Sequence, residues 1–93
     1  MAEIIRADGT RETVEPDKPD GTFSGDFLRK IVGGWIEIVS LGPARKRMIV
    51  DEEGLLKNKP WNADATTIYW ENTRPNVNRI HGDVVVIDWD EIT

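Results

Sequence analysis

The chain has 93 residues, 39% of them hydrophobic and 31% charged, and its 17 acidic against 12 basic residues give a formal net charge of −5. At this length only about 60–65% of the unfolded surface can be buried, which fits one domain over residues 1–93 and excludes a multi-domain enzyme. The absence of cysteine excludes disulfides and thiolate chemistry, and a single histidine leaves little scope for metal binding. The excess of acid argues against tight nonspecific binding to nucleic acid. No apolar run approaches the roughly 20 residues of a membrane span and no signal region is visible, so we expect a cytoplasmic protein that does not bind membranes.

The chain opens with a predicted hairpin. Residues 3–7 and 10–14 have the composition of two strands, and Asp8-Gly9 between them tolerates the positive φ of a tight turn. The run 15–21, with two prolines, a glycine and four charges, can extend neither a sheet nor a helix and is expected to be a surface loop.

A helix is predicted next. Ser24 can cap a helix that begins at Gly25, and Phe23 and Leu28 then occupy the two positions of a hydrophobic staple. Gly33-Gly34 ends it.

A second hairpin follows. Residues 35–41 and 46–50 are rich in β-branched and other apolar side chains, and Gly42-Pro43 forms the turn between them. The acidic run 51–54 ends this hairpin, and residues 55–61 form a connector.

The last third predicts a helix and a central strand. Asn62 can cap the helix, with Asp64 in its first turn, and Pro75 breaks it. Val84–Ile87 is the most hydrophobic run in the chain and suits a strand buried on both faces. The order β-β-α-β-β-α-β indicates an α+β domain, with two short helices against a mixed or mostly antiparallel sheet.

The same patterns predict the core. Trp35 and Trp89, in strand patterns, are expected in the core or at its edge. The other expected core residues are Ile5, Phe27, Leu28, Ile31, Ile36, Ile38, Met48, Ile68, Val84 and Val86.

No catalytic group stands out. Ser24 is explained as a helix cap and Ser40 as a strand residue, so neither is expected to be a nucleophile for His81. The acidic runs 51–53 and 88–91 are typical of solvated turns and lack the donor spacing of a calcium loop. We therefore expect no catalytic residue, no metal and no cofactor.

Two of the four tryptophans are harder to place in a core. Trp61 follows a proline just before a helix cap, and Trp70 lies about 200° around its helix from Ile68, off the apolar stripe. Large aromatic side chains on a polar face are usual anchors for protein partners or stacked rings. Folding of loop 72–81 over Trp70 is an equally good interpretation.

Basic residues concentrate in the same region. Seven of the twelve lie between positions 45 and 79, and a guanidinium beside an aromatic ring suits a ligand with a phosphate or a nucleobase. Solvated hairpin charges would explain the pattern as simply. The candidate ligand- or partner-binding residues are Arg45, Arg47, Trp61, Tyr69, Trp70, Arg74, Arg79 and His81.

Several short segments in this order also form a recognisable set. The most specific are Val32–Glu37 (Val-Gly-Gly-Trp-Ile-Glu) and Glu52–Lys57 (Glu-Glu-Gly-Leu-Leu-Lys). The full set is 5–10, 14–16, Phe27, 31–39, 50–57, 62–63, 65–66 and 81–86. Together they resemble a family of small proteins of unknown function found mainly in phages, prophages and other mobile elements of bacteria. The stretch 70–80 departs from the pattern, and no functional residue can be carried over from the family.

The resemblance implies a phage-type accessory protein that acts in the cytoplasm of a bacterial host. Such genes often serve counter-defence or host takeover, and without catalytic residues the protein would act by binding. We expect a non-enzymatic protein that sequesters a small nucleotide-like signal. An inhibitor docked directly on a host defence protein is the alternative, and an acidic DNA mimic directed against restriction enzymes is a weaker one because basic residues are scattered among the acidic ones. The short chain and its aromatic residues also favour a homo-oligomer.

Overall fold

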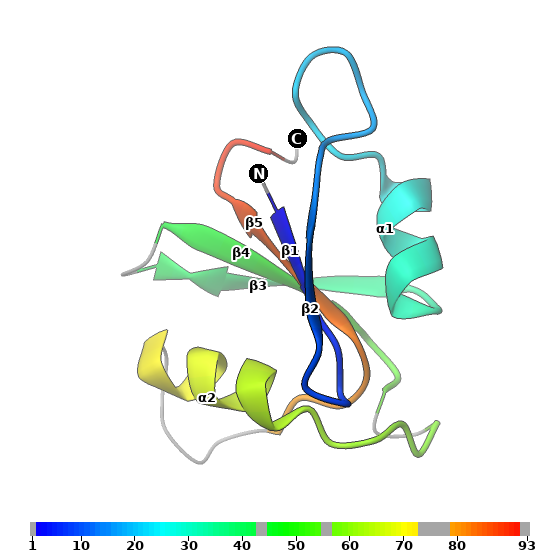
Figure 1. The fold of residues 1–93 in the computed structure, drawn as a ribbon, viewed down its shortest axis with the longest axis vertical. Coiled ribbons are helices and arrows are strands. Elements are labelled where there is room, and N and C mark those ends of the chain that lie inside the picture. Colours follow the sequence, from blue (N-terminus) through cyan, green and yellow to red (C-terminus); the bar gives the residue numbers. More distant parts are fainter. Residues whose placement is uncertain (1, 43–44, 55–56, 73–78, 92–93) are drawn as a thin grey trace.

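A computed structural model describes residues 2–42, 45–54, 57–72 and 79–91, and within these ranges the chain forms a five-stranded sheet with one helix against each face (Figure 1). The elements in chain order are β1 (Ala2–Ile5), β2 (Arg11–Val14), α1 (Gly25–Val32), β3 (Ile36–Leu41), β4 (Lys46–Asp51), α2 (Ala63–Asn72) and β5 (Val84–Asp88). The strand order is β2-β1-β5-β4-β3, and all neighbouring strands are antiparallel. The predicted α+β class and β-β-α-β-β-α-β order are confirmed.

The central strand β5 divides two hydrophobic clusters. Successive side chains of a strand point to opposite faces. Val85 and Ile87 therefore pack with α1, whereas Val84 and Val86 pack on the side of α2. All four are buried, as the continuous apolar run predicted.

Helix α1 begins as predicted. The Ser24 hydroxyl accepts a hydrogen bond from the Phe27 N–H at 3.2 Å, and the helix ends at Gly33, whose φ of 85° is left-handed. Phe23, before the cap, stacks on Phe27 with 5.7 Å between ring centroids, and it shares one cluster with Leu28. The staple and the cap together fix the angle at which the chain enters the helix.

Three of the residues expected in the core are exposed, so these predictions are wrong. Ile38 is 46% exposed because β3 is an edge strand, and α1 packs against Ile36 at the start of that strand. Trp35 and Trp89 are 63% and 46% exposed, since one precedes the edge strand and the other lies in the turn after β5. The other expected core residues are buried or partly buried against the two clusters: Ile5, Phe27, Leu28, Ile31, Ile36, Met48, Ile68, Val84 and Val86.

Truncation of Ile49 to alanine tests this packing. Ile49 is fully buried on β4 and pairs with Val85 of the central strand, so Ile49→Ala should lower the free energy of unfolding by about 2–4 kcal/mol through lost burial and a cavity. Urea unfolding measures this loss. Thr13→Ala, at an exposed position of β2, is the control and should change stability by less than about 0.5 kcal/mol. Equal losses in the two variants would contradict the assigned core.

Candidate binding site

The segments that precede α2 and β5 lie side by side. Trp61 and His81 form an isolated antiparallel bridge, and the Asn62 N–H donates to the Ile80 carbonyl at 2.8 Å. The chain before α2 is thereby paired with the chain before β5. This pairing brings together candidate residues that are about twenty positions apart in the sequence.

Asn62 is the buried residue that holds this junction. Its Nδ2 donates to the carbonyls of Ile5 and Gly82, each at 2.9 Å, and its Oδ1 accepts from the Ala65 N–H at 3.0 Å. The first of these carbonyls ends β1, the second precedes β5, and the amide is in the first turn of α2. The predicted cap of α2 is therefore confirmed, and the same side chain also ties two central strands to the helix.

Thr66 fixes the orientation of Trp61. Its Oγ1 accepts from the Trp61 indole Nε1 at 3.0 Å and from the Ile80 N–H at 2.9 Å, and it donates to the Asn62 carbonyl at 2.8 Å. Thr66 is only 1% exposed, so the side of α2 that it shares with Trp70 is not the polar face that the periodicity predicted. Trp70 itself is half-buried.

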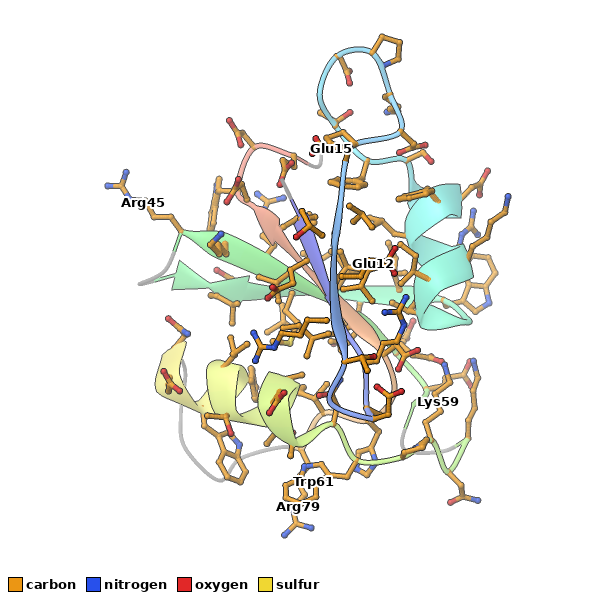
Figure 2. The ribbon with its side chains drawn as sticks, in the orientation of Figure 1. Glu12, Glu15, Arg45, Lys59, Trp61 and Arg79 are labelled. Carbon is orange, nitrogen blue, oxygen red and sulfur yellow. The ribbon has the colours of Figure 1, made fainter. Side chains whose placement is uncertain are left out.

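Arg79 lies over the indole of Trp61 (Figure 2), and His81 pairs with Trp61 through the backbone bridge. The Arg79 guanidinium carbon lies 5.4 Å from the centre of the Trp61 ring, within the range of a cation–π contact. The His81 Nδ1 donates to the Lys59 carbonyl at 3.0 Å, because a carbonyl oxygen can only accept. This bond fixes the orientation of the imidazole ring.

A polar pocket of about 290 Å³ lies beside this group, and we call it the Arg79 pocket. Three of the candidate residues, Tyr69, Arg79 and His81, line it. The other lining residues come from β3, β4 and the turn after β4, and from the residue before His81: Glu37, Val39, Val50, Asp51, Glu52, Gly54 and Ile80. The lining of the pocket thus combines Tyr69, Arg79 and His81 with three acidic residues, Glu37, Asp51 and Glu52.

Asp51 forms a buried ion cluster at the wall of this pocket. Its side chain is fully buried, and its Oδ2 lies 2.5 Å from Lys59 Nζ and 3.1 Å from Lys57 Nζ. Burial by itself raises the pKa of the Asp51 carboxyl, but hydrogen bonds from Lys59, the Glu53 N–H and Lys57 outweigh it and hold the pKa at about 2, below the ordinary 3.8. The interpretation of residues 51–53 as a solvated turn is therefore wrong at Asp51, while Glu52 and Glu53 are exposed.

Lys59 connects this cluster to both helical and strand segments. Its Nζ also donates to the Val32 carbonyl at the end of α1. The lysine side chains lie against two glycines: a Cβ at Gly34 would meet Lys57 Nζ, and one at Gly82 would lie 2.8 Å from Lys59 Cδ. Gly82 also has a φ of 86°, which favours glycine. The only sequence signal of this arrangement is two lysines a few residues after an aspartate that ends an apolar strand.

The remaining candidate residues do not join the pocket. Arg45 lies at the end of the β3–β4 hairpin, at the left of the view and away from Trp61 and Arg79 at its lower edge (Figure 2). Arg47 stacks on Trp89, with its guanidinium carbon 4.7 Å from the ring centre. The single surface expected from the sequence is therefore split in two, because Arg47 packs on Trp89 after β5 and Arg45 lies at the hairpin end. Arg74 lies outside the described residues.

Trp35 is a third tryptophan with an arginine side chain over its ring. The Arg29 guanidinium carbon lies 4.9 Å from the centre of the Trp35 ring, beside a pocket at the end of α1. Each exposed tryptophan in the described part of the chain is thus partly covered by a cation, which lowers the apolar area that it presents to water.

Residues 4–93 match the model of a protein family described as a domain of unknown function, DUF3846. The chain belongs to this family. No curated protein and no solved structure matches it. Three segments that carried the resemblance in the sequence meet around Lys59 in this DUF3846 domain: the glycines after α1, the acidic turn after β4 and the His-Gly pair before β5.

Within the described ranges, neither helix is long and apolar enough to cross a membrane. In the same ranges, no three histidine, aspartate or glutamate side chains are grouped as metal ligands.

Acid titration tests the Asp51 cluster. Because its pKa is lowered, Asp51 contributes stability above pH 3.8 that is lost as the pH falls toward 2, by about 2 kcal/mol in total. Asp51→Asn should be less stable at pH 7, and its free energy of unfolding should change less between pH 4 and pH 2 than that of the wild type. Urea unfolding at several pH values measures both effects. Asp26→Asn, at an exposed carboxylate of α1, should keep the wild-type slope, and an unchanged slope in Asp51→Asn would show that the cluster is not ionised as described.

Proposed function

We propose that this DUF3846 protein acts without catalysis, by sequestering a small nucleotide-like ligand in the Arg79 pocket. The observation that carries the proposal is the composition of one pocket: Arg79, His81 and Tyr69 line it together with two exposed acidic residues, Glu37 and Glu52. Binding pockets that orient a ligand typically combine apolar surface with a few polar groups of this kind.

The residues that line the pocket include groups suited to the phosphate, the base and the ribose of a nucleotide. Arg79 would pair with a phosphate through charge-assisted hydrogen bonds, with His81 beside it. The Tyr69 ring, with Val39 and Val50, supplies apolar surface for a base. Glu37 and Glu52 would accept hydrogen bonds from ribose hydroxyls or an exocyclic amino group, the role that acidic residues have in other nucleotide sites.

The size of the pocket favours a mononucleotide. Its volume of about 290 Å³ lies at the lower end of the roughly 300–1,000 Å³ that ligand pockets span. In the phage-type setting that the resemblance implies, removal of such a signal in the bacterial cytoplasm would serve counter-defence or host takeover.

A titration with adenosine 5′-monophosphate, guanosine 5′-monophosphate, adenosine and inorganic phosphate tests the proposal. At least one nucleotide should raise the melting temperature with concentration and alter tryptophan fluorescence, because Trp61 lies against Arg79. Arg79→Gln should weaken that binding about tenfold or more, since a charged hydrogen bond to phosphate is lost. Arg79 is exposed, so the fold should survive.

Arg45→Gln is the matched control, because it removes an exposed arginine that does not line the pocket and lies away from Arg79, and it should leave affinity unchanged. If none of the four probes binds, or if Arg45→Gln weakens binding as much as Arg79→Gln, the Arg79 pocket is not a nucleotide site.

Direct docking on a host protein is the second candidate. The three exposed tryptophans, each with an arginine on its face, favour it, because these two residue types dominate the energetics of protein interfaces. An inhibitor of this kind would lose its partner on Trp61→Ala or Trp35→Ala while none of the four small probes bound.

A further inference from the structure

The two edges of the sheet differ in how well they are protected. The β2 edge is four residues long and carries Arg11 and Glu12, and Arg11 is paired with Glu3. The β3 edge is six residues long, and its only charge is Glu37. Charged residues and short length are the usual protection of an edge strand against pairing with another chain. By this criterion β2 is protected and β3 is open.

The register of β3 shows which backbone groups point away from the sheet. The Glu52 N–H donates to the Trp35 carbonyl at 2.9 Å, and this pair continues the β3–β4 register in which Ile36 faces Asp51. Hydrogen-bonded pairs alternate along antiparallel strands. Positions 35, 37, 39 and 41 therefore bond to β4. The N–H and C=O groups of Ile36, Ile38 and Ser40 point outward at the edge.

These three residues are self-complementary. If a second β3 pairs antiparallel about a two-fold axis at Ile38, Ile38 faces its own copy and Ile36 faces Ser40. All three outward positions then fall in hydrogen-bonded pairs, each of which exchanges two N–H···O bonds. An isologous contact of this kind closes at two copies.

The side chains agree with this register. Ile36 packs against the α1 cluster, and Ile38, two residues farther on, lies on the same face of the strand, where it is 46% exposed. Pairing would bring the two Ile38 side chains together and cover both. On the other face, Glu37 would lie opposite the partner's Val39, so like charges do not meet.

We propose that the chain forms a two-fold dimer by antiparallel pairing of β3 with β3 of a second copy, centred on Ile38. The sheet becomes continuous across the two subunits, and no long unprotected edge remains. Because Glu37 and Val39 line the Arg79 pocket, the dimer also places the partner's β3 next to each pocket. The dimer does not depend on the identity of any ligand.

Sedimentation and light scattering of the full chain test the association. The wild type should reach twice the chain mass of 10.5 kDa with increasing concentration. Ile38→Lys should shift the mass to that of one chain, with dimer affinity at least tenfold weaker, because two lysines would face each other across the axis. The monomer should accept this change, since Ile38 is exposed there. Thr13→Lys, an equivalent substitution on the β2 edge, should leave the dimer intact.

Amide hydrogen exchange tests the register and does not rely on a variant. In the wild-type dimer the amides of Ile36, Ile38 and Ser40 should exchange slowly, although they have no acceptor within their own sheet. The proposal is overturned if these amides exchange at the rate of exposed ones, if the wild type stays monomeric up to about 1 mM, or if Ile38→Lys remains dimeric. A series of masses beyond two copies, as pairing of β3 with β2 of a further copy would give, also overturns it.

Discussion

The position of α2 on the sheet depends on the buried side-chain amide of one residue, Asn62. Asn62 is 1% exposed, and every hydrogen bond of its side chain goes to a different element: the end of β1, the approach to β5 and the first turn of α2. A buried amide without hydrogen-bond partners would destabilise the fold. The three hydrogen bonds of Asn62 form only when β1, the chain before β5 and α2 meet at this residue, so they fix the position of the junction. The position of α2, and with it Tyr69 on one wall of the Arg79 pocket, follows from this junction.

Lys59 has the corresponding role on the other side of the pocket. It is a charged residue that joins the end of α1, the end of β4 and the chain before β5, through the Val32 carbonyl, the Asp51 carboxylate and close packing against Gly82. Removal of one partner from a buried ion pair is destabilising, because the remaining charge is left uncompensated. Asp51, the partner of Lys59, lines the Arg79 pocket, which lies on the α2 side of the sheet beside the hydrophobic cluster that contains Val50 and Ile80.

The elements of the fold were predictable because their causes are local, whereas their exposure was not. Ser24 caps α1 through a neighbour three residues away, and the run Val84–Ile87 shows its double burial in its composition. Ile38 and Trp35 have the same apolar character, but no local pattern shows that β3 lies at an edge. Within the site, Trp61, Arg79 and His81 were expected together and do meet. The burial of Asp51 depends on lysines folded back from the connector, which spacing alone does not show.

Strand β1 pairs with β5, a strand that is synthesised much later. Ile5 pairs with Val84, so the innermost neighbour of the first strand is synthesised about 80 residues later. At roughly 5–20 residues per second, that interval lasts several seconds on the ribosome. During this time β1 can pair only with β2, and a two-stranded hairpin is marginally stable in water. The centre of the sheet is therefore completed only after β5 has been synthesised, and a chain truncated before β5 would leave β1 and β4 without the strand that joins them.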